Sequence, residues 1–237
     1  MAVFSKFPLF RLPHNEILRT IRVMDLENIY GICMDIDEIK KVFGNKSTVN
    51  MGKTGCFAFN QSILQNFFPI EKLSTMAENF RDSKIPPNLF MQNRFTLSIR
   101  ENSFPTNITL NDLLLINSKV FSVENNQNKK MSPKHLNKFI KLWQKGSNPY
   151  MENLLIFYFN AEEDDKEIVM KGIQHEVIPG HRRRTFKSVG FTYPYTVTGG
   201  IDIYRMDGTK ATIWIEKEST SAIVGMFVWF DHCAVES

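Results

Sequence analysis

The chain has 237 residues, 43% of them hydrophobic and 23% charged, as is typical of a globular protein that buries a sizeable core. Its formal net charge of +4 is too small to indicate a nucleic-acid partner by itself. The sequence has three scattered cysteines without a CxxC pair and no run of 18 apolar residues. This argues against a disulfide scaffold and a membrane span, so we expect a cytoplasmic or nuclear protein.

Residues 7–43 are predicted to form three short amphipathic helices. Pro13 suits the first turn of a helix, and Ile17, Leu18 and Ile21 follow on one apolar stripe. Three such helices in fewer than 40 residues cannot close a substantial core alone. We therefore expect this segment to pack against a partner, either another protein or the rest of the chain.

A polar stretch, GNKSTVNMGKTG, follows and predicts a linker over residues 46–55. Its MGKTG part resembles a phosphate-binding loop. That motif needs a glycine five residues before Gly52, where this chain has Ser47. The linker interpretation is favoured, and no cofactor is expected.

Strand and helix patterns alternate beyond the linker. Four segments are predicted strands: CFAFN (56–60), RFTLSIR (94–100), KVFSVE (119–124) and ENLLIFYF (152–159). A helix is predicted over 110–116, and a longer one begins with a Ser132 cap and Pro133 and ends at Gly146. This order predicts βα units in an irregular leucine-rich-repeat-like stack, with uneven spacing of the strand centres.

The C-terminal part is predicted to be rich in β-strands. In GIDIYRMDGTKATIWIE, a two-residue turn would mix polar and apolar residues on one face. A three-residue loop over 206–208 pairs Ile201 with Ile213 and gives a consistent apolar face. We therefore predict that Gly208 closes a bulged hairpin in the left-handed conformation, and that 222–230 adds a strand to the same sheet.

QHEVIPGH (174–181) has the residue types of a zinc peptidase. Its histidines, His175 and His181, are six residues apart, about 240° around a helix, and Pro179 and Gly180 would break that helix. The third ligand could be any of Glu216, Glu218 and His232. Surface histidines in a turn that ends a helix are the favoured interpretation, so no metal is expected. Since no GxSxG motif occurs either, we expect a protein that is not an enzyme.

The densest basic cluster is HRRRTFK (181–187), close in sequence to the acidic AEEDDKE (161–167). Its arginines could bind phosphate on a partner, because the guanidinium fork suits two-point contacts with phosphate. A solvated charged surface is the alternative. Aromatic interleaving of the kind that a nucleic-acid platform uses is not evident beside the cluster, so no nucleic-acid partner is expected.

The segment FPLFRLPHNEILRTIRVMDLENIY resembles an F-box, the helical module that docks onto the Skp adaptor of cullin-based ubiquitin ligases. Its FPLFRLP opening is similar to the F-boxes of a large nematode family. Downstream, LNDLLLINSK, LNKFIKLWQKGSNPYMENL and IDIYRMDGTKATI resemble that family's F-box-associated domain, in the expected order. The residues that the resemblance assigns to adaptor binding are Leu12, Pro13, Ile17, Leu18, Ile21, Met24, Leu26 and Ile29.

The resemblance implies an α+β protein with an F-box over 5–45, a linker over 46–55 and an F-box-associated substrate-recognition domain over 56–237. It implies a substrate-receptor subunit of an SCF-type ubiquitin ligase, with a Skp-type adaptor, a cullin scaffold and a target protein as partners. No motif marks the target-binding residues. The segment YGICMDIDEIKK departs from the family pattern through Gly31 and three acidic residues. A stand-alone interaction module that has lost ligase binding is therefore the alternative.

Overall fold

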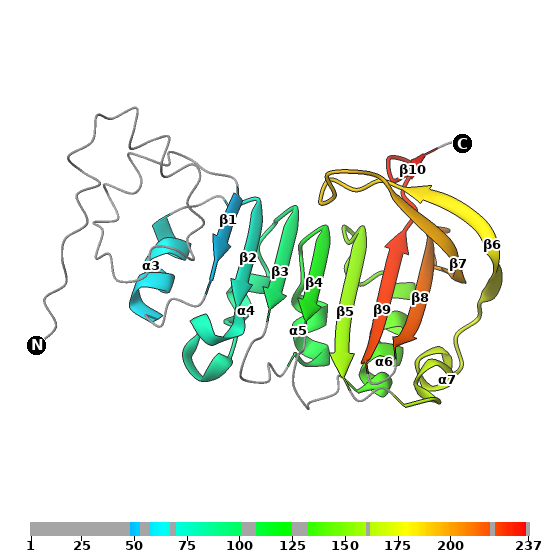
Figure 1. The fold of residues 1–237 in the computed structure, drawn as a ribbon, viewed down its shortest axis with the longest axis horizontal. Helices are drawn as coiled ribbons and strands as arrows, with labels where there is room; N and C mark the ends of the chain where they lie inside the picture. The colour runs from blue at the N-terminus through cyan, green and yellow to red at the C-terminus, as the bar shows by residue number, and fades with distance from the viewer. Residues whose placement is uncertain are drawn as a thin grey trace, which may run out of the picture.

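The computed structural model describes residues 48–52, 57–66, 70–100, 108–124, 132–159, 162–218 and 221–235. Within them the protein is a mixed α and β structure, dominated by one sheet with the strand order β1-β2-β3-β4-β5-β9-β8-β7-β6-β10 (Figure 1). The predicted F-box, including all eight adaptor-binding residues, lies outside the described residues. No helix within them is long and apolar enough to cross a membrane.

The first half of the sheet is parallel and regular. Its strands are β1 (Thr48–Met51), β2 (Lys72–Met76), β3 (Thr96–Arg100), β4 (Val120–Glu124) and β5 (Asn153–Phe159). Thr48, Lys72, Thr96 and Val120 share one register position, each 24 residues after the one before. That period lies in the range of leucine-rich repeats, and it is more regular than the sequence analysis predicted.

The connections between these strands carry the helices. They are α3 (Phe57–Asn66), two short 3₁₀ turns η3 (Ala77–Asn79) and η4 (Arg81–Ser83), α4 (Pro87–Phe90), α5 (Leu110–Leu115) and α6 (Pro133–Gln144). Helices α5 and α6 lie behind the sheet in Figure 1. The predicted helices over 110–116 and from Pro133 are thus confirmed. Ser132 does precede α6, but its side chain makes no capping hydrogen bond.

Two predictions in this half were wrong. Residues 57–60 of CFAFN begin helix α3 instead of a strand, because a short apolar run does not distinguish the two by its periodicity. Residues 48–51, predicted as linker, form strand β1, which buries Val49 and Met51 and leaves Thr48 exposed. The domain boundary itself stays a prediction.

The second half of the sheet is antiparallel. After α7 (Asp165–Met170) come β6 (Glu176–Phe186), β7 (Tyr195–Tyr204), β8 (Lys210–Glu218), β9 (Ser221–Val228) and β10 (Ala234–Val235). The predicted hairpin is confirmed, because Ile201 pairs with Ile213 and Gly208 has a φ of 88°. Strand β9 also lies in the same sheet as predicted, between β5 and β8. The predicted turn in QHEVIPGH was wrong, since residues 176–181 belong to β6.

The two faces of the sheet carry different cores. The main core lies on the face that the helices cover, and it joins strand residues such as Leu97 and Phe121 to Phe139 and Trp143 of α6. A smaller aromatic cluster forms on the opposite face. Its buried members are Phe186, Val197, Phe227 and Cys233, with Phe191, Trp214, Trp229 and Phe230 packed around them.

Strands β6 and β7 form a long ribbon that curls over this second face (Figure 1). The bend is at Gly199 and Gly200, with φ values of 63° and 111°. A Cβ on Gly200 would lie 2.5 Å from Cγ2 of Thr212, so a side chain does not fit there. Opposite them, the register of β6 shifts between Ile178 and Arg183. The bend lets one strand serve both the flat sheet and the ribbon.

Candidate functional site

The face of the sheet opposite the helices, here called the open face, is polar over its parallel half. Asn50, Ser74, Ser98 and Ser122 occupy one row across β1 to β4. Ser122 Oγ donates to Ser98 Oγ at 2.9 Å. Arg100 Nη2 contacts Asn50 Oδ1 at 2.9 Å and Ser74 Oγ at 3.2 Å. Small polar side chains with internal bonds make a flat surface that a partner can approach closely.

The row continues into apolar residues where the sheet becomes antiparallel. Leu155 of β5 follows Ser122, then Gly225 of β9 and Trp214 of β8. A Cβ on Gly225 would lie 3.3 Å from Phe227, 3.4 Å from Trp214 and 3.5 Å from Leu155, so these side chains pack over the glycine. The open face therefore changes from polar to aromatic as it reaches the ribbon.

A cleft opens between β7 and β8 at this aromatic end. Its volume is about 230 Å³, and it is lined by Tyr195, Thr196, Val197, Thr198, Trp214, Glu216 and Phe227. The rings of Tyr195 and Phe227 stack at 5.4 Å with an angle of 9°. Glu216 is exposed at the side of this cleft. One carboxylate and several aromatic rings thus surround a space of side-chain size.

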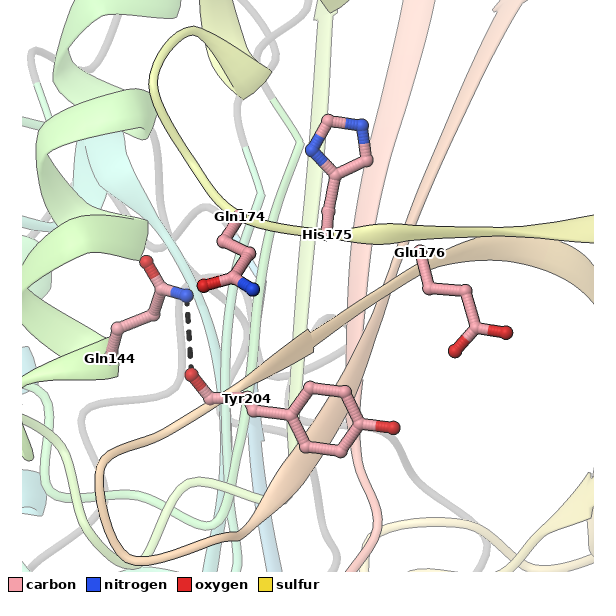
Figure 2. A pocket seen from close by; sticks show the side chains of 5 residues that line it. All are labelled: Gln144, Gln174, His175, Glu176 and Tyr204. Carbon is pink, nitrogen blue, oxygen red and sulfur yellow. Dashed lines mark hydrogen bonds between the residues drawn. The ribbon is translucent and has the colours of Figure 1, made fainter.

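A second pocket, of about 270 Å³, lies where the end of α6 meets β6 and β7. It is lined by Gln144, Gln174, His175, Glu176 and Tyr204 (Figure 2). Gln144 Nε2 donates to the backbone oxygen of Tyr204 at 3.2 Å. In Figure 2 the His175 ring points away from the other four side chains. The ring is held by a 2.7 Å contact between its Nδ1 and the Ile173 carbonyl.

A buried carboxylate fixes the ribbon to the sheet. Glu152 accepts from Ser188 Oγ at 2.6 Å, and its other oxygen lies 3.0 Å from both Lys119 Nζ and His232 Nε2. Burial raises the pKa of Glu152, but these hydrogen bonds outweigh burial and leave the pKa below its ordinary value. Burial, followed by the charge of Glu152, raises the pKa of the Cys233 thiol to about 12.

A second polar network lies beneath the ribbon bend. Arg184 Nη1 pairs with Asp202 at 2.7 Å, and Thr212 Oγ1 donates to the same carboxylate at 2.6 Å. Trp229 Nε1 in turn donates to Thr212 Oγ1 at 2.7 Å, while Arg184 lies over the Trp229 ring. Asp202 is only 3% exposed, so the arginine supplies the positive charge that this buried carboxylate needs.

The histidines that suggested zinc are not brought together with the proposed third ligands. Within the described residues, only two groups of three side chains have metal-ligand spacing: Glu152, His232 and Cys233, and Glu162, Asp164 and Asp165. Neither contains His175 or His181. In the first group the Lys119 ammonium already contacts Glu152, and in the second the acidic residues mostly face solvent. Glu216 lines the cleft between β7 and β8 instead.

The basic cluster of β6 divides between two roles. His181, Arg182 and Arg183 are exposed, whereas Arg184 turns inward to Asp202. Exposed apolar side chains flank it on the ribbon and at its ends. They are Val177, Val189, Tyr193, Tyr195, Tyr204 and Met206.

Sequence reasoning did not single out the aromatic residues of either pocket, and it named His175 and Glu216 only as candidate zinc ligands. Tyr195, Trp214 and Phe227 come from three strands, and only the ribbon bend brings Tyr195 onto Phe227. The adjacent glycines 199 and 200 within a strand pattern were the available signal, since such glycines mark bulges and close approaches. The residues predicted to bind the adaptor lie outside the described part of the chain.

Comparison with known proteins gives one finding. Residues 85–156 match the family model described as F-box associated. No curated protein and no solved structure matches the chain. The matched segment runs from just before α4 to β5, so it covers the last parallel repeats and their helices. Residues 85–156 of this chain are therefore an F-box-associated domain.

Proposed function

We propose that this protein is a substrate-receptor subunit of an SCF-type ubiquitin ligase. Residues 5–45 would hold a Skp-type adaptor, and residues 56–237 would present a target protein. The match of residues 85–156 to the F-box-associated family carries this proposal, because such domains act together with an F-box in recognising targets. The contribution to ubiquitin transfer is then proximity, with the chemistry supplied by other subunits.

The geometry of the described residues supports a binding role. The parallel strands make a stiff platform, and the ribbon and the open face place exposed side chains along its edge. Both pockets are small, so they suit single side chains of a protein target.

The proposed adaptor-binding role of the N-terminal segment rests on sequence alone. Leu12, Ile17, Leu18 and Ile21 are the residues proposed for the buried centre of the adaptor interface, where a few apolar anchors carry most of the binding energy. Gly31 costs a helix about 1 kcal/mol relative to alanine. The alternative function, an interaction module that no longer binds the ligase, follows from this departure.

A binding experiment with purified Skp-type adaptor tests the proposal. The wild-type chain should retain the adaptor, and the double variant Leu12→Asp/Ile17→Asp should lose it, because two buried charges disrupt the interface. Lys145→Asp, an exposed substitution at the end of α6, is the matched control and should bind normally. Failure of the wild type to bind would leave the stand-alone module as the function.

A further inference from the structure

The cleft between β7 and β8 exists because two paired strands separate. They pair from Tyr204 and Lys210 as far as Ile201 and Ile213. Beyond that point Gly199 and Gly200 turn β7 away, and its residues 195–198 pair only with β6 among the described strands. The edges of β7 and β8 thus face a shared gap. An extended peptide can use such edges through main-chain hydrogen bonds.

Aromatic rings form the floor and one wall of this gap. Phe227 is only 2% exposed and lies at the base, while Tyr195 stacks on it and is 44% exposed. Trp214 lies opposite Gly225 on β8, and the rings of Trp214 and Phe227 both pack over this glycine. The exposed parts of Tyr195 and Trp214 therefore border the cleft with π-electron density, which attracts cations.

A carboxylate completes the site. Glu216 lies two residues after Trp214 on β8, so both side chains point to the open face. Among the described residues Glu216 makes no ion pair. Lys217 projects from the opposite side of β8, and Arg184 on β6 is bound to Asp202. Arg183, opposite Thr198, has the opposite orientation to Arg184 along β6.

We propose that this cleft binds the cationic side chain of a lysine or arginine in an extended segment of a target protein. The cation would lie against Tyr195 and Trp214 and pair with Glu216, while the edge of β7 that β6 leaves unpaired borders the peptide backbone. This inference rests on the proposed function, since it names the chemical class of target that the domain selects. The net charge of +4 does not oppose it, because distant surface charges are screened beyond about 8 Å at physiological salt.

Peptide binding to the purified full chain tests the inference without any adaptor present. The probes are four fluorescent pools of ten-residue peptides with randomised flanks and a fixed central Lys, Arg, Gln or Glu. The Lys and Arg pools should bind about fivefold more tightly than the Gln pool, as expected for a cation held on aromatic faces near a carboxylate. The Glu pool should bind most weakly.

Variants locate this preference within the molecule. Glu216→Lys should remove the difference between the Lys and Gln pools, and Tyr195→Ser should reduce it. Both residues are exposed, so their replacement leaves the core intact. The control, Glu163→Lys, makes the same charge change at an exposed residue before α7 and should retain the preference.

Two results would overturn the inference: equal binding of the Lys and Gln pools to the wild type, or a preference that persists in Glu216→Lys. Neither result depends on adaptor binding. A chain that retains the adaptor but shows no preference for Lys would keep its ligase role and lose this target class. A chain that prefers the Lys pool but does not bind the adaptor would be a stand-alone module that binds basic segments.

Discussion

The two faces of the sheet differ in how they are covered. Helices such as α5 and α6 lie against one face, where they share a core of buried aliphatic and aromatic residues with the strands. The other face is polar over the parallel half and is covered by a ribbon of the same sheet over the antiparallel half. Parallel sheets usually have both faces buried. The difference indicates that the helix-covered face holds the fold together, and that the open face is available for binding.

The largest loss of stability is expected from a substitution in the helix-covered core. Trp143 of α6 is fully buried, and Trp143→Ala should lower the free energy of unfolding by about 3–5 kcal/mol. Urea denaturation followed by circular dichroism measures this. Lys145→Ala, an exposed substitution two residues away, should change stability little. Similar losses for both variants would mean that this core does not carry the fold.

A substitution in the aromatic cluster tests whether the two faces of the sheet unfold independently. Phe186 is fully buried and packs edge-on against Phe227 at 5.2 Å and Trp229 at 5.5 Å. Phe186→Ala should cost about 3 kcal/mol or more. Amide hydrogen exchange should then rise in β6 and in residues 195–198 of β7, while β3 and β4 keep their protection. A uniform rise through the whole sheet would show that both faces unfold as one unit.

A substitution in the hydrogen-bond network of Glu152 should cause a smaller loss of stability, and this loss should depend on pH. Glu152→Gln should lower the free energy of unfolding by about 1–3 kcal/mol at neutral pH, because Ser188, Lys119 and His232 lose a charged acceptor. Since the pKa of Glu152 is lowered in the folded state, its contribution is present above about pH 4.5 and is lost as the pH falls further. Denaturation curves from about pH 7 to about pH 3 should therefore converge for the two proteins. A difference independent of pH would exclude this role.

The smallest loss of stability is expected from a substitution in the loop of the β7–β8 hairpin. Gly208 has a φ of 88°, and no atom lies within 4 Å of the position that a Cβ would occupy there. Gly208→Ala should therefore cost about 1 kcal/mol through backbone strain alone. Thermal unfolding measures it. Met206→Ala in the same loop, where the side chain is 84% exposed, is the control and should leave the melting temperature nearly unchanged.

Local patterns predicted the elements whose signals lie within a few residues. Helix α6 has an apolar stripe between Pro133 and Gly146, and the hairpin register follows from keeping Ile201 and Ile213 on one face. Strands β1 and β2 were missed because their open-face residues, such as Asn50 and Ser74, are polar. With β1 misplaced, the 24-residue period could not be recognised.

The candidate sites were harder to predict, because they depend on contacts between distant segments. Tyr195 meets Phe227 only after β7 bends at its two glycines, and Glu152 meets His232 across 80 positions of sequence. Sequence spacing carries no information on such contacts. The resemblance of LNDLLLINSK and LNKFIKLWQKGSNPYMENL to an F-box-associated domain is supported by the match over residues 85–156.

The constant step between the first four strands has an evolutionary consequence. In a stack of this kind each unit contacts mainly its neighbours. An in-frame duplication or loss of one unit would therefore move the platform edge by a single strand, about 4.8 Å, and leave the distant hairpins undisturbed. Relatives could thus acquire longer or shorter platforms for different clients while they keep the same aromatic end.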